Sequence, residues 1–260
     1  FYLKGEQRGS YILESEVEAT TLIDPDSTPN NWLTGEDDYA SADLAVEQQL
    51  PSGIILLNGD GPGEGFNDPT TTMPVGGNPG ITLGAQRLAV FERAAQIWSQ
   101  ALSVEVPVVV MARFDSLSCS SSSGVLGAAG PAQVARDFSG GAANTWYHMA
   151  LANQLARSDL NGSGPEINAT FNSSIDNNDS CLSGTNWYYG LDGNAQGNIN
   201  LLSVVLHEFG HGLGFSSFVS QSGQRFFNLN DAYMRHLYDA SSGVTWASMS
   251  DGARAASSVN

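Results

Sequence analysis

The chain has 260 residues, 41% of them hydrophobic, which is enough to bury a core in one large domain or in one domain with a subdomain. Ten basic residues face 27 acidic ones, and the formal net charge of −17 argues against binding to nucleic acid or to an anionic membrane surface. No stretch reaches the apolar length needed to span a bilayer, so we expect no membrane insertion.

The N-terminus begins at Phe1, with neither Met nor a signal-peptide pattern. We interpret the chain as a processed form or fragment of a secreted protein. Residues 1–80 are expected to form an N-terminal segment packed on the core. This segment contains turn-forming residues near Asp24 and Thr28, a short buried strand over 52–57 and a Gly/Pro-rich loop over 58–80. Residues 81–260 are expected to form the core itself.

An amphipathic helix is predicted at the start of the core. Its buried stripe has apolar residues spaced three and four apart: Leu88, Phe91, Ala95, Trp98 and Leu102. A Val-rich strand follows over 104–111, where Pro107 suggests an edge position or a bulge. A second helix is predicted over 144–157, a second strand over 166–175, and a third helix over 199–213.

Two cysteines, Cys119 and Cys181, lie in loop-like sequence rich in Ser, Asn and Gly. An even number of cysteines in an exported chain favours one disulfide between them. Two free buried thiols are the alternative. The disulfide would close a long loop and stabilise the fold by about 4 kcal/mol.

The third helix carries the run His207-Glu208-Phe209-Gly210-His211, which fits the pattern H-E-x-x-H. Residues four apart on a helix project from the same face, so the two imidazoles can bind one metal ion. Glu208 lies beside that pair, where it can act as a general base on a water. Zinc suits such a site because it accepts nitrogen ligands and an exchangeable water.

The surrounding sequence supports a helix that buries one face and presents the histidines on another. Its apolar face is formed by Leu202, Val205, Leu206, Phe209 and Leu213. Gly212 and Gly214 weaken the helix after His211 and allow the chain to turn away.

At this point the sequence resembles a known group. The segment from His207 to Phe215 resembles the H-E-x-x-H-x-x-G-F segment of metzincin peptidases. Three further segments are similar to secreted bacterial metalloproteases, which often carry a protease-associated domain. They are the residues around Trp146, the run Trp187 to Gly193, and the third helix with the residues that follow it. The resemblance covers about residues 80–260. It implies an α+β, zincin-like core with a mixed twisted sheet, an amphipathic backing helix and a metal-binding active-site helix.

The resemblance implies zinc on His207 and His211, with Glu208 as the base. Many metzincins have a third histidine where this chain has Ser217, and a neutral hydroxyl is a poor zinc ligand. One source of the third ligand is a residue beyond Asn260, as in leishmanolysin-like enzymes, if this chain lacks a C-terminal subdomain. Asp231, in a predicted helix over 230–236, is a second source.

His236 is a further candidate, and a site without a third protein ligand is the remaining option. The metzincin Met-turn is not evident: Met249 precedes a predicted helix start with Ser250 as its cap. The other histidine, His148, is expected to be packed or to cap a helix rather than to bind metal.

The acidic loops around residues 60–68 and 176–192 offer clustered oxygens that suit Ca²⁺. Neither loop has the EF-hand spacing, and we favour solvated loops without bound calcium.

The function that follows is zinc-dependent endopeptidase activity on proteins or peptides, in which zinc activates a water and Glu208 moves its proton. The strand over 166–172 is expected to run beside the cleft and pair with an extended substrate. The alternative is a non-catalytic structural or binding protein that retains a zincin scaffold with an incomplete metal site.

Overall fold

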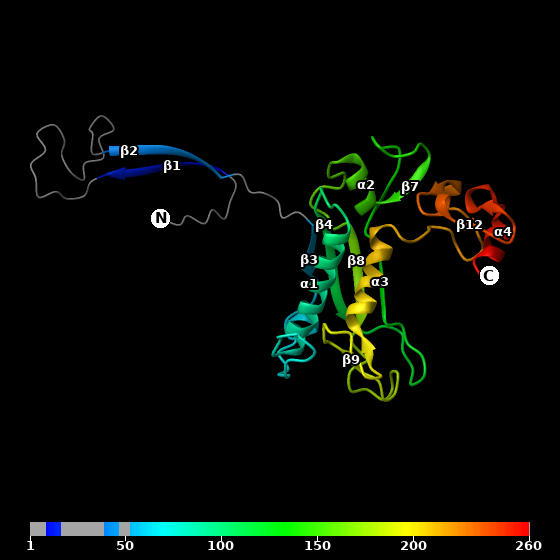
Figure 1. Cartoon of the computed structure of the whole chain (residues 1–260), viewed down its shortest axis with the longest axis horizontal. Helices are drawn as coiled ribbons and strands as arrows, with labels where there is room; N and C mark the ends of the chain where they lie inside the picture. Colours follow the sequence, from blue (N-terminus) through cyan, green and yellow to red (C-terminus); the bar gives the residue numbers. More distant parts are fainter. Residues whose placement is uncertain (1–8, 17–38, 47–52, 260) are drawn as a thin grey trace, which may run out of the picture. The chain divides into compact units, whose positions relative to one another are not determined.

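The computed structural model describes residues 9–16, 39–46 and 53–259. The chain divides into two compact units, residues 1–50 and residues 51–260. In the first unit, β1 (Gly9–Glu16) and β2 (Tyr39–Val46) pair antiparallel, with Gly9 opposite Val46 (Figure 1). The turns predicted near residues 24 and 28 lie outside the described residues.

The second unit is built on a mixed four-stranded sheet. In spatial order its strands are β3 (Ile54–Asn58), β4 (Val108–Asp115), β8 (Ile167–Asn172) and β5 (Gly127–Pro131). The first three strands are parallel, and β5 runs antiparallel to β8 at one edge. Residues 53–80, which we grouped with the N-terminal segment, therefore supply an edge strand of this sheet.

Four α-helices accompany the strands of this unit. They are α1 (Leu83–Ala101), α2 (Met149–Ala156), α3 (Leu201–Leu213) and α4 (Asp251–Ser257). The mixed sheet and these helices confirm the α+β class. Helices α1 and α3 contact each other and pack against the sheet, running roughly along its strands (Figure 1). Helix α1 contacts β3, and α3 contacts β8 and β5.

Shorter elements complete the second unit. A three-stranded sheet has the order β11 (Asn230–Asp231), β7 (Thr145–His148), β6 (Val134–Ala135). Two-stranded pairs are formed by β9 (Trp187–Tyr188) with β10 (Ile199–Asn200) and by β12 (Tyr238–Asp239) with β13 (Val244–Thr245). The 3-10 turns are η1 (Gly65–Asn67), η2 (Phe226–Asn228), η3 (Met234–His236) and η4 (Trp246–Ser248).

Three predicted elements differ from the structure. Pro107 indicated an edge strand or a bulge, but β4 is a central strand that begins after it at Val108, so the missing Pro N–H costs no ladder hydrogen bond. The helix predicted over 144–157 begins only at Met149, because residues 145–148 pair with β6 and β11 instead.

The helix predicted over 230–236 is absent. Residues 230–231 form β11, and the Asp231 carboxylate accepts the Met234 amide at 2.7 Å to start the short turn η3. A side chain that binds the backbone this closely favours a turn over a helix. By contrast, the predicted cap at Ser250 is confirmed, since its hydroxyl accepts the Ala253 amide at the start of α4.

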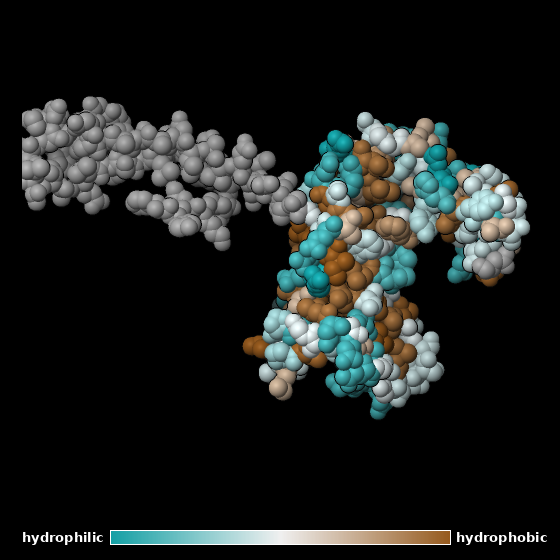
Figure 2. Space-filling view, viewed as in Figure 1, coloured by the Kyte–Doolittle hydropathy of each residue, from teal (hydrophilic) through white to brown (hydrophobic). Residues whose placement is uncertain are grey.

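Phe91 on α1 is the centre of the core. Its fully buried ring makes edge contacts with Phe66 at 4.7 Å, Phe171 at 4.8 Å and Phe209 at 5.9 Å between ring centroids. These rings come from η1, β8 and α3, so one cluster joins both helices to the sheet. Figure 2 shows hydrophobic side chains gathered in the middle of this unit, over the region of α1 and α3.

The two helices are also joined by a polar contact, because the Trp98 indole N–H of α1 donates to the Leu206 carbonyl of α3 at 3.0 Å. The predicted disulfide is confirmed: Cys119 and Cys181 are bonded, with Cα atoms 5.2 Å apart. None of the helices in the described part of the chain has the length and apolarity to cross a membrane.

Gly212 sets how closely α3 approaches the sheet. A Cβ atom at this position would meet side-chain atoms of Ile167 on β8 at 2.5 and 2.8 Å. The side chain of Ile167 is itself fully buried, so it has little room to move aside.

We predict that Gly212→Ala lowers the free energy of unfolding by about 1–3 kcal/mol, the usual cost of overpacking a core. The matched control is Gly252→Ala in α4, where an added Cβ has open space around it. That variant should be neutral or should gain up to about 1 kcal/mol. Urea unfolding of both proteins checks this prediction, and equal stabilities would contradict it.

Candidate active site

His207 and His211 lie one turn apart on α3, and their Nε2 atoms are 3.0 Å from each other. Two nitrogens bound to one tetrahedral zinc at 2.0–2.1 Å would be separated by roughly 3.3 Å. His207 is exposed and His211 half-buried, so the pair is open to solvent. The helix thus brings both imidazoles close to the spacing that one shared ion needs.

The ring of His211 is fixed by the backbone just after the helix. Its Nδ1 lies 3.0 Å from the carbonyl oxygen of Phe215. A carbonyl only accepts, so Nδ1 carries the proton and Nε2 keeps the lone pair that a metal binds. Gly214 makes this contact possible, because it ends the helix at a φ of +123° and turns Phe215 back toward it.

Glu208 reaches across to the edge strand of the sheet. Its Oε2 accepts the backbone amide of Ala129 on β5 at 2.9 Å. That amide therefore points away from β8, toward the unpaired side of β5. Gly127 permits the close approach, since a Cβ there would lie 2.8 Å from the Phe171 ring and 3.4 Å from Glu208 Cγ.

Asp231 is buried and holds the segment after α3. One carboxylate oxygen accepts the Ser217 hydroxyl at 2.7 Å and the Phe218 amide at 2.9 Å, and the other accepts the Met234 amide. The described residues contain no group of three His, Cys, Asp or Glu side chains that could hold a metal ion. Asp231 is thus not brought together with His207 and His211 in this structure.

His236 also lies apart from the histidine pair. It lines a pocket of about 740 Å³ with Leu151 and Leu155 of α2 and with Gly214 and Phe215 at the end of α3. A third zinc ligand, whether Asp231, His236 or a residue beyond Asn260, stays a prediction.

His148 is buried as expected, although its side chain does not cap α2. Its Nε2 lies 2.7 Å from the Ser216 hydroxyl, and its ring stacks on Phe218 at 4.4 Å. Ser216 in turn approaches the His211 carbonyl at 3.3 Å. Burial, together with the nearby charge of His211, lowers the pKa of His148 to about 4.

The acidic loops use their carboxylates to bind protein groups. Asp60 accepts the amides of Phe66 at 2.8 Å and Phe114 at 2.9 Å. Asp68 and Asp176 both pair with the buried guanidinium of Arg87, at 3.3 and 3.5 Å. The contacts of Asp68 and Asp176 tie both loops to α1, so these carboxylates have a structural role in the fold.

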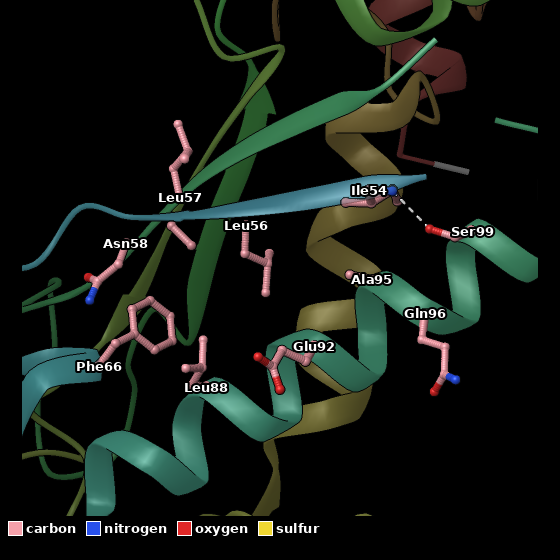
Figure 3. Close-up of a pocket in the computed structure, with 11 residues that line it drawn as sticks. Ile54, Leu56, Leu57, Asn58, Phe66, Leu88, Glu92, Ala95, Gln96 and Ser99 are labelled. Carbon is pink, nitrogen blue, oxygen red and sulfur yellow. Dashed lines mark hydrogen bonds between the residues drawn. The ribbon is translucent and has the colours of Figure 1, made fainter. Parts of the chain in front are cut away.

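A second pocket, of about 600 Å³, lies at the opposite edge of the sheet between β3 and α1 (Figure 3). Leu56 and Leu88 line it, and the Ile54 amide donates to Ser99 at 2.9 Å along its rim. Glu92 is its only ionisable lining residue. No histidine stands beside that carboxylate among the residues that line this pocket.

Two parts of the site were missed by the sequence reasoning. The segment Gly127–Pro131 lacks the alternating apolar residues of a strand, so no element was predicted there. The Phe215 carbonyl carries no side-chain signal at all. The only sequence signal for β5 is a run of small residues, Gly127 to Gly130. In the structure this run lies close to α3.

Comparison of the chain with known protein families, with curated proteins and with solved structures gave no match. The chemistry of the site therefore rests on its own residues.

We predict that Asp231→Asn destabilises the fold by about 2 kcal/mol, because it weakens three hydrogen bonds at a buried carboxylate. Zinc affinity should stay within a few-fold of the unchanged protein if Asp231 is structural. Thermal unfolding and zinc titration check both parts. Asp239→Asn, at an exposed turn in the same region, is the control. Loss of zinc binding without loss of stability would instead identify Asp231 as a ligand.

The buried His148 predicts a pH dependence of stability. Its folded pKa of about 4 lies below the unfolded value of 6.5, so the unfolded chain binds more protons between these values. Its contribution is fully present above pH 6.5 and is lost as the pH falls toward 4, by up to about 3 kcal/mol. Unfolding of metal-free protein from pH 7 to 4 should show a shallower decline in His148→Gln, and parallel curves would contradict the assignment.

Proposed function

We propose that this protein is a secreted zinc-dependent endopeptidase with a zincin-type core. The observation that carries the proposal is the arrangement on α3, where two imidazole Nε2 atoms lie 3.0 Å apart and Glu208 lies between them in sequence. The carboxylate of Glu208 also lies at the unpaired side of the edge strand β5. One helix therefore offers two histidine ligands for a metal and a carboxylate base, and the free edge of β5 offers a backbone with which a substrate can pair.

His207 and His211 would hold the metal through their Nε2 atoms. The donor set fits zinc, which favours neutral imidazole nitrogens, and the Phe215 carbonyl keeps His211 in the matching tautomer. When bound, zinc supplies Lewis acidity that polarises a carbonyl and lowers the pKa of a water. The third ligand belongs to the same proposal and comes from Asp231, His236 or a residue outside this chain.

Glu208 is the proton carrier in this proposal. Its carboxylate accepts a proton from the water that attacks the scissile carbonyl, and it then donates that proton to the leaving amine. The side chain is half-buried and reaches the site from the same helix as the histidines.

The strand that we expected to bind substrate is not an edge strand. We expected the strand over 166–172 to pair with substrate, but β8 already has β4 on one side and β5 on the other. Both of its edges are occupied by ladder hydrogen bonds. The edge strand β5 has only one neighbour among the described strands, so an extended peptide pairs with β5 instead.

We predict that Glu208→Gln lowers kcat/KM for peptide hydrolysis by on the order of 10²–10⁴, the usual contribution of a general acid–base group. Zinc content should be unchanged, because Gln removes the base but keeps both imidazoles. Hydrolysis of casein and of a fluorogenic peptide, with zinc measured on the same samples, checks this. Glu92→Gln, at the opposite edge of the sheet, is the matched control and should retain full activity.

Retained proteolysis in Glu208→Gln with zinc bound would overturn the role of Glu208. A protein that binds no zinc and cleaves nothing would instead favour the alternative, a binding protein on a zincin scaffold. The same measurements on a longer form of the chain test whether a residue beyond Asn260 supplies the third ligand.

A further inference from the structure

Four aromatic residues form a surface patch around the segments that follow α3 and around β7: Trp146, Phe218, Phe226 and Phe227. Phe226 lies 5.4 Å from Trp146 and 6.0 Å from Phe218 between ring centroids, and Phe227 lies 4.6 Å from Phe226. Phe227 is 74% exposed and Phe226 is 39% exposed. Large aromatic groups gathered at a surface in this way commonly mark a binding site.

Phe227 is held outward at a cost in backbone conformation. Its φ of 47° and ψ of 33° place a bulky residue in the left-handed region, which such residues rarely adopt. Strained backbone of this kind tends to occur at functional sites. The next residue, Asn228, also has a positive φ, of 60°, so the turn as a whole presents the ring to solvent.

A chain of contacts connects the patch with the proposed zinc ligands. Phe218 stacks on His148, whose Nε2 is 2.7 Å from the Ser216 hydroxyl. Ser216 approaches the carbonyl of His211. The patch therefore belongs to the same end of α3 as the histidine pair.

The edge strand leads to the same place. Three residues after β5 ends at Pro131, the chain enters β6, where Val134 pairs with His148 and Ala135 with Tyr147. The next residue, Arg136, places its guanidinium 5.3 Å from the centre of the Trp146 ring. A peptide that follows the free edge of β5 toward β6 thus approaches the aromatic patch.

We propose that the aromatic patch is a specificity subsite that binds an apolar or aromatic side chain of the extended peptide substrate. This inference rests on the proposed function and adds the substrate class. The occupant is a peptide side chain because the patch continues the path of the edge strand.

The test uses the Glu208→Gln form of the full chain, so that peptides bind without being cleaved. The probes are blocked Ala/Ser hexapeptides that carry a single Phe at successive positions, and binding is followed by fluorescence polarisation of a labelled set. We expect Phe at one or two positions to raise affinity about tenfold over the Phe-free peptide. Phe227→Gly and Phe226→Ala, each added to Glu208→Gln, should abolish that gain.

The variants are chosen to keep the fold. Glycine accepts the left-handed conformation at position 227, so Phe227→Gly removes the ring without adding strain. The matched control is Ile81→Ala, since Ile81 is 65% exposed and lies outside the patch. It should keep the full gain from Phe. Thermal unfolding of each variant confirms that it is folded before binding is compared.

Retention of the Phe gain in both patch variants would overturn the subsite. A change of self-association on sedimentation, with peptide binding unaffected, would overturn it too and identify the patch as a contact between copies. If the patch variants lose the gain from Phe but the wild-type protein cleaves no peptide, the subsite stands and the endopeptidase proposal fails. If the wild-type protein cleaves peptides but the patch variants keep the full gain from Phe, the endopeptidase proposal stands and the subsite fails.

Discussion

The close approach of α3 to the sheet is the constraint on which the site depends. Gly212 faces Ile167 of β8 with no space for a Cβ, and Gly127 on β5 leaves room for Phe171 and Glu208. Two glycines, one on each element, therefore set how near the helix comes to the strand edge. If the helix stood further out, Glu208 could not reach the Ala129 amide, and the histidine pair would be separated from the free edge of β5.

The rest of the unit holds the two ends of that helix. Before α3, Asp176 pairs with Arg87 of α1. The disulfide joins Cys181, in the same loop, to Cys119, which precedes β5. After α3, Asp231 binds Ser217 and the backbone of the following turn. These polar contacts are satisfied within the protein, so they fix the entry and exit of the helix by themselves.

The sequence was most informative where one periodic pattern coincided with burial. The spacing of apolar residues located α1 and α3 to within a few residues, because Phe91 and Phe209 meet in one core. It failed where pairing between distant segments decided the structure. Residues 145–148 carry helix-compatible neighbours but pair with β6 and β11, and Gly127–Pro131 becomes a strand through β8 alone. Such pairings leave no local periodicity to detect.

In the proposed endopeptidase, the hydrogen bond between Glu208 and Ala129 would link substrate binding to catalysis. A peptide that pairs with β5 through the Ala129 amide must take the donor that Glu208 now uses. Binding then frees the carboxylate on the side of the histidine pair, where a proton acceptor is needed. Gly130 leaves open space next to this amide, since nothing lies within 4 Å of the position of its absent Cβ. Under this proposal the small residues of β5 serve two requirements at once: they admit α3 close to the strand, and they leave its free edge open to a peptide backbone.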